Sequence, residues 1–132
     1  MFRMGELVGQ NEAEKRIFRL CAQDESRHVA FGVTHLKYLL ETQPERREEL
    51  HSYLDRFEPA IALSQGGLTT EGDVSEALAI LLGGGKDHYD EGLKKLLAIR
   101  KKQVVEYMHR LEVIGMPERR ERMSPTLKQY LG

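Results

Sequence analysis

The segment CAQDESRHVAFG, residues 21–32, decides how the fold of this 132-residue chain is interpreted. It lies within residues 11–42, a stretch that contains no proline and in which apolar residues recur every three or four positions. That spacing predicts one long amphipathic helix. Asn11 is the expected N-cap, and Glu14 is its expected capping-box partner.

Ionisable side chains share the apolar stripe of this expected helix. On a helical wheel centred on Cys21, Glu25 and His28 fall within about 40° of the centre and Asp24 lies about 60° away. A carboxylate on a buried face is costly unless it is paired or bound to a metal. Glu25 and His28 are three residues apart, so both can reach one cation, and a carboxylate with an imidazole suits iron, manganese or zinc. An ion pair between Glu25 and a basic residue of another helix would meet the same requirement, and an isolated, solvated pair is the simplest alternative.

The remaining sequence is also predicted to be helical, with no strand-like alternation. We expect one helical domain over residues 1–132, interrupted at Gly66–Gly67, in a loop at 69–74 and at Gly83–Gly85. Its expected parts are a remnant of a preceding helix with a turn at 1–10, the motif helix at 11–42, helices at 44–64, 75–82 and 87–114, and a charged tail at 118–132 with one loose helical turn.

Composition excludes several classes of protein. Hydrophobic residues make up 40% and charged residues 31%, a composition typical of a soluble, folded chain. The 20 basic and 21 acidic residues nearly balance, so charge predicts neither a nucleic-acid partner nor an anionic membrane surface. No apolar run approaches the roughly 20 residues that span a bilayer, and the first residues do not resemble a signal peptide. The single Cys21 fits a reducing compartment, so we expect a cytoplasmic protein.

The string QDESRHVAFGVTHLKYL, residues 23–39, resembles the D-E-x-R-H-x-x-F-G motif on the last metal-bearing helix of ferritin-like di-iron carboxylate proteins. The most similar members are the p-aminobenzoate N-oxygenase-like and ribonucleotide-reductase-small-subunit-like oxidases. The matching residues are Asp24, Glu25, Arg27, His28, Phe31 and Gly32. The resemblance implies an all-α, ferritin-like helical bundle in which Glu25 and His28 are metal ligands. It also implies that Asp24 holds the histidine of a second motif, while Arg27 is expected to pair with Asp24 or with acids on an adjacent helix.

The family plan requires a second Glu-x-x-His pair and two further glutamates. Little of the sequence precedes Glu25, so we expect only the C-terminal half of the bundle, with extra C-terminal helices. Glu106 and His109 have the required spacing but lack the flanking Asp and Phe-Gly, so a solvated pair is the favoured interpretation. His35 is a further candidate donor, with a hydrogen-bonded core histidine as the favoured alternative.

Two functional hypotheses follow. In the first, the chain is related to O₂-dependent di-iron oxidoreductases, with iron, or else manganese or zinc, held partly by this chain and with an unknown small-molecule substrate. In the second, it is a non-catalytic helical module without metal that dimerises or binds another helical chain. Because a half-bundle exposes an apolar face, we expect a homodimer through the helix at 11–42. No catalytic residue is assigned by either hypothesis.

Overall fold

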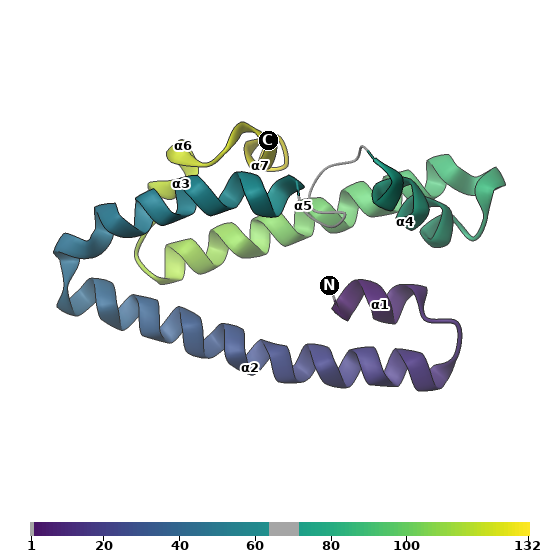
Figure 1. Cartoon of the computed structure of the whole chain (residues 1–132), viewed down its shortest axis with the longest axis horizontal. Coiled ribbons are helices and arrows are strands. Elements are labelled where there is room, and N and C mark those ends of the chain that lie inside the picture. The colour runs from purple at the N-terminus through teal and green to yellow at the C-terminus, as the bar shows by residue number, and fades with distance from the viewer. Residues whose placement is uncertain (1, 64–71) are drawn as a thin grey trace. The chain divides into compact units, whose positions relative to one another are not determined.

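The computed structural model describes residues 2–63 and 72–132, and every regular element within them is a helix (Figure 1). This confirms the all-α class. The elements are α1 (Phe2–Val8), α2 (Glu12–Thr42), the 3-10 helix η1 (Pro44–Arg46), α3 (Arg47–Leu63), α4 (Asp73–Gly83), the 3-10 helix η2 (Lys86–His88), α5 (Tyr89–Val113), α6 (Arg119–Arg122) and α7 (Pro125–Lys128). The described helices include no segment that is both long and apolar enough to cross a membrane.

The chain divides into two compact units, which we call unit 1 (Met1–His35) and unit 2 (Leu36–Gly132). Among the expected breaks, Gly66–Gly67 lies outside the described residues, as does most of the loop expected at 69–74. Where the chain is described again, α4 already begins at Asp73. Gly84 ends α4 in the left-handed conformation, with φ of 86°, and its N–H donates to the carbonyl of Ile80.

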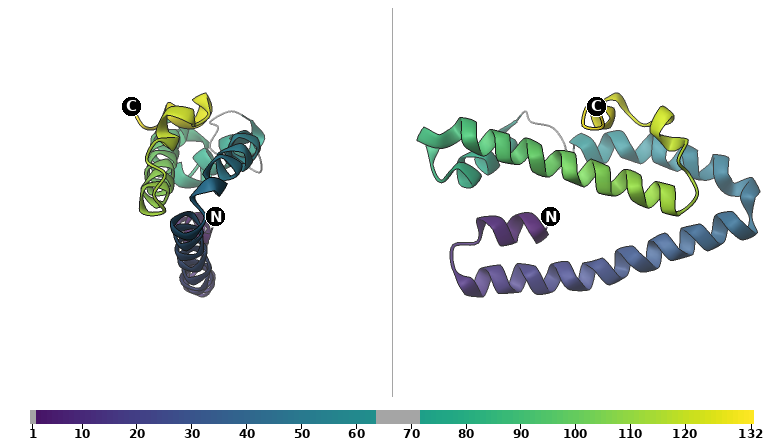
Figure 2. Two further views of the ribbon diagram at one scale, coloured as in Figure 1. Left: turned by 90° about the vertical axis from the view of Figure 1, so that its left-hand side faces the viewer. Right: turned by 180° about the vertical axis from the view of Figure 1, so that it is seen from behind.

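Unit 1 is a helical hairpin in which α1 folds back along the first part of α2 (Figures 1 and 2). The helices approach closely at Gly5, where a Cβ atom would collide with the ring of Phe18. An ion pair between Glu6 and Arg19, with an N–O distance of 2.7 Å, joins the same two helices. The start of α2 is capped as expected, because Asn11 Oδ1 accepts a hydrogen bond of 2.9 Å from the backbone N–H of Glu14.

Unit 2 is organised around one face of α5. The buried positions of this helix follow each other at intervals of three and four and therefore form a single stripe: Gly92, Leu96, Arg100, Val104, Met108 and Leu111. Helix α4 packs against the first part of α5, as both figures of the ribbon show (Figures 1 and 2). The contact is so close at Gly92 that a Cβ atom there would overlap the backbone oxygen of Ala79.

The tail differs from the sequence-based expectation of a charged, loosely structured end. It forms α6 and α7, and it buries Met123, Leu127 and Tyr130 in unit 2. Most charges of the tail form one run, residues 118–122, and apolar residues follow at positions 123, 127 and 130. These apolar side chains are buried, whereas only Arg119 of the charged run is buried.

Replacing Gly92 with Ala should destabilise unit 2, although Ala is the better helix former by about 1 kcal/mol. The added methyl group meets backbone rather than a movable side chain, so α4 and α5 must separate, at a cost of about 1–3 kcal/mol. Urea denaturation followed by circular dichroism measures the change.

Gly32→Ala is the matched control, since Gly32 is also inside a long helix but a Cβ atom at this position would meet no other atom within 4 Å. This variant should be as stable as the parent or more stable. Equal effects of the two substitutions would show that helix propensity, not the α4–α5 contact, governs both positions.

Candidate functional site

The two expected metal ligands lie on α2 within unit 1 and point in the same direction. The Glu25 Oε2 and His28 Nδ1 atoms are 3.4 Å apart. Two ligand atoms of one cation, each about 2.1 Å from it, are separated by about 3.0–3.4 Å in octahedral or tetrahedral geometry. The pair therefore has a spacing that fits two ligands of a single metal ion.

The side chains of this pair are exposed, which differs from the stripe predicted from the helical wheel. Glu25 retains 55% and His28 70% of its side-chain area. The cost of burying a carboxylate, which motivated the search for a partner, therefore does not act on Glu25 within this chain. It would act only if another helix covered this face of α2.

The neighbours of the pair also face solvent. Arg27 Nη1 lies 3.6 Å from Asp24 Oδ1, so Arg27 pairs with the acid on its own helix. His35 is exposed and stacks on Phe31, with ring centroids 6.2 Å apart and an angle of 13° between the planes. It is therefore not a buried core histidine, and Phe31 is the neighbour that orients its ring. Cys21 has a free thiol and is half-buried.

In the second Glu-x-x-His sequence, the glutamate and the histidine have different ion-pair partners. His109 Nδ1 lies 3.7 Å from Glu112, whereas Glu106 lies 3.7 Å from Arg110. Within residues 2–63 and 72–132, three or more ligand-type side chains (His, Cys, Asp or Glu) nowhere gather closely enough to hold a metal ion. Glu25 and His28 therefore form a pair with no third ligand-type side chain gathered around it among the described residues.

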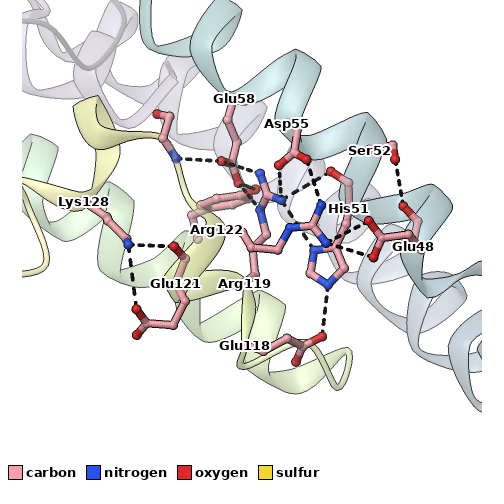
Figure 3. A network of polar contacts seen from close by, with 12 residues as sticks. Glu48, His51, Ser52, Asp55, Glu58, Glu118, Arg119, Glu121, Arg122 and Lys128 are labelled. Atoms are coloured by element: carbon pink, nitrogen blue, oxygen red, sulfur yellow. Dashed lines mark hydrogen bonds and ion pairs between the residues drawn. The ribbon is translucent and has the colours of Figure 1, made fainter.

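A second concentration of charge lies in unit 2, between α3 and α6 (Figure 3). Arg119 has a fully buried side chain, and its Nε and Nη2 atoms donate to the two carboxylate oxygens of Glu58 at 3.0 and 2.8 Å. Its Nη1 atom donates to Asp55 Oδ1 at 2.6 Å. Glu58, which is 3% exposed, also accepts a hydrogen bond of 2.7 Å from the hydroxyl of Tyr107 on α5. The network therefore joins α3, α5 and α6.

More charged groups surround this centre. His51, also buried, places Nε2 at 3.1 Å from Glu118 Oε1, and Glu118 accepts a further bond of 2.7 Å from Arg47. Arg122 bridges Glu48 and Asp55 at the exposed side of the network. Each of these groups has a charged partner of opposite sign or a hydrogen bond, so the arrangement is suited to holding helices together.

The electrostatic environment agrees with a structural role. Burial by itself lowers the pKa of Arg119, but the bonds to Glu58 and Asp55 outweigh it and raise the pKa above the ordinary value. Burial and the hydrogen bond to Glu58 raise the pKa of the Tyr107 phenol well above its usual range. The hydrogen bond from Arg119 lowers the pKa of Asp55. These shifts favour the charged forms of Arg119 and Asp55 and the neutral form of Tyr107 in the folded protein.

Arg119, Glu58 and His51 are not among the site residues predicted from the sequence. The sequence carries little signal for Arg119, because it lies within a run of five charged residues, 118–122. No local feature marks Glu58 as its partner, since 61 positions separate the two residues.

Comparisons with known proteins add no relative: no family model, no curated protein and no solved structure matches the chain.

Substituting Arg119 with Ala should lower the free energy of unfolding of unit 2 by about 3–5 kcal/mol, because it leaves the carboxylate of Glu58 buried without its main partner. Urea denaturation measures the loss. Arg122→Ala is the control, since Arg122 bridges two acids at the surface and should cost about 1 kcal/mol or less. Similar losses in both variants would contradict a special role of the buried pair.

The stability of unit 2 should fall in acid, and Asp55→Asn should flatten this dependence. The folded-state pKa of Asp55 is depressed, so its contribution is present above the unfolded pKa of about 3.9 and is lost as the pH falls through the lower folded value. Urea midpoints between neutral pH and about pH 3 test this. Glu12→Gln on unit 1 is the control and should leave the pH dependence of stability unchanged. If the stability of the Asp55 variant falls with pH as steeply as that of the parent, the assignment of this dependence to Asp55 is refuted.

Proposed function

We propose that α2 supplies one half of a metal centre in a ferritin-like protein related to the di-iron oxidases, with Glu25 and His28 as two of the ligands. The observation that supports this is the 3.4 Å separation of their ligand atoms within a string that resembles the di-iron motif. A carboxylate oxygen and an imidazole nitrogen suit iron, and also manganese or zinc.

A protein metal site commonly uses at least three protein ligands, and nowhere among the described residues do three ligand-type side chains gather closely enough to hold a metal ion. The remaining ligands therefore have to come from another helical chain, which would also cover the exposed face of α2. Iron held in such a completed site supplies O₂-dependent oxidation chemistry. In that assembly Asp24 is placed to hold a ligand histidine of the other chain, and the proposed location is the cytoplasm, in keeping with the free thiol of Cys21.

Metal binding by the full chain tests the proposal. Purified protein is stripped with a chelator, titrated separately with Fe(II), Mn(II) and Zn(II) under anaerobic conditions, and analysed by calorimetry and elemental analysis. The parent should bind at least one of these ions. Glu25→Ala and His28→Ala should each lower the affinity by about tenfold or more, because each removes one of two ligands.

His109→Ala is the matched control, since His109 is also an exposed histidine three residues from a glutamate on a helix. Its metal affinity should equal that of the parent. Metal binding that His28→Ala leaves unchanged, or that His109→Ala weakens equally, would overturn the proposed site, as would a parent that binds none of the three ions.

A second function, that of a non-catalytic helical interaction module, is favoured by a different observation. Large apolar side chains on α2 are exposed in unit 1, among them Ile17, Leu20 and Phe31. Exposed apolar residues in a row along one helix mark a surface that another helix covers. This function does not require a metal.

A further inference from the structure

A row of exposed residues follows the unit 1 part of α2 at alternating intervals of three and four. We call this row the α2 seam, and it consists of Ile17, Leu20, Asp24, Arg27, Phe31 and Thr34. Intervals of this kind are those of the contact positions in a coiled coil. The seam is apolar toward both ends, where Phe31 is 75% exposed and Ile17 and Leu20 are each more than half exposed.

The centre of the seam carries one acid and one base. Asp24 and Arg27 are both exposed and lie 3.6 Å apart on successive turns of the helix. A partner helix that covers the apolar ends must also cover these charges. It therefore has to present a base opposite Asp24 and an acid opposite Arg27, because a desolvated charge without a partner costs far more than the apolar contact contributes.

We propose that the α2 seam binds the same seam of a second copy of this chain, antiparallel, with the two-fold axis passing between residues 25 and 26. In this register Asp24 lies opposite Arg27 of the second copy, and Arg27 opposite its Asp24. Leu20 lies opposite Phe31 of the second copy, and by symmetry Phe31 lies opposite Leu20. Ile17 meets the methyl-bearing side chain of Thr34.

Other pairings of the seam with itself are unfavourable. A parallel, in-register pair would place Asp24 against Asp24 and Arg27 against Arg27, so like charges would meet at the centre. An antiparallel pair displaced by one heptad toward the N-terminus would place Asp24 against Leu20 and Arg27 against Ile17. Only the central register matches each charge with its opposite and apolar residues with one another.

The proposal rests on the interaction-module function and names its partner, and it requires no metal at Glu25 and His28. Glu25 and His28 lie beside the seam on α2, not in it, since the coiled-coil intervals pass through Asp24 and Arg27. Self-association through the seam should therefore persist in a chelator and should be unaffected by His28→Ala.

A charge exchange tests the register. In full-length chains, Asp24→Arg places an arginine opposite Arg27, and Arg27→Asp places an aspartate opposite Asp24. Each single variant should dimerise about tenfold or more weakly than the parent in sedimentation equilibrium with a chelator present. An equimolar mixture of the two single variants should associate, because a seam with two central arginines then faces a seam with two central aspartates.

The mixture separates an effect between chains from the loss of the ion pair within one helix, since neither single variant restores that internal pair. Glu12→Lys and Lys15→Glu are the controls, because Glu12 and Lys15 are also an acid and a base three residues apart on α2 but lie outside the seam. Neither control should change the dimer. Circular dichroism confirms that every variant remains helical.

Three results would overturn the proposal. A parent that stays monomeric at high micromolar concentration would exclude pairing of the seam with a second copy. Single variants that dimerise as well as the parent, or a mixture that associates no better than either variant alone, would exclude the register while leaving the interaction-module function in place. Metal titration of the chelator-free parent and of its His28→Ala variant reports separately on Glu25 and His28.

Discussion

Arg119 is fully buried in unit 2, and a buried guanidinium requires a carboxylate within hydrogen-bonding distance. Glu58 meets this requirement with both of its oxygens and also accepts a hydrogen bond from the hydroxyl of Tyr107. The position of α6 is therefore determined by α3 and α5 together. Removing Arg119 or Glu58 leaves the other one buried without its main partner, so the tail is an integral part of the unit.

The charged side chains of the motif on α2 are in the opposite environment, since they contact solvent instead of being buried. The ionisable side chains of the motif are exposed, and their partners lie on the same helix: Glu25 with His28, and Asp24 with Arg27. Such contacts contribute little to stability in water. The free energy that these contacts contribute rises when another helix excludes water from them. The metal-centre proposal and the proposed interaction surface both depend on this effect. The buried charges of Arg119 and Glu58 are paired within unit 2, whereas the motif charges of α2 face the outside.

Local features of the sequence correspond to much of the helical architecture. The Asn11 and Glu14 pair marks the start of α2, and Gly84 ends α4 through its positive φ. The tail differs from the prediction, because its many charges suggested a loose end although Met123 and Leu127 are buried. For the candidate site, the motif placed Glu25 and His28 on one side of a helix, and the structure brings their atoms together. The expected burial of the pair is wrong for this chain by itself, because burial depends on what packs against the helix.

The sequence by itself determined the all-α class, the course of α2 and the neighbouring positions of Glu25 and His28, because capping bonds and helical spacing act over a few residues. The tertiary structure decided which charges are buried, since the contact of Arg119 with Glu58 joins positions 61 residues apart and no helical period reports it. It also decided that the motif side of α2 is exposed. Burial results from contacts between distant segments, whereas the residue pattern of one helix specifies only which face is available for them.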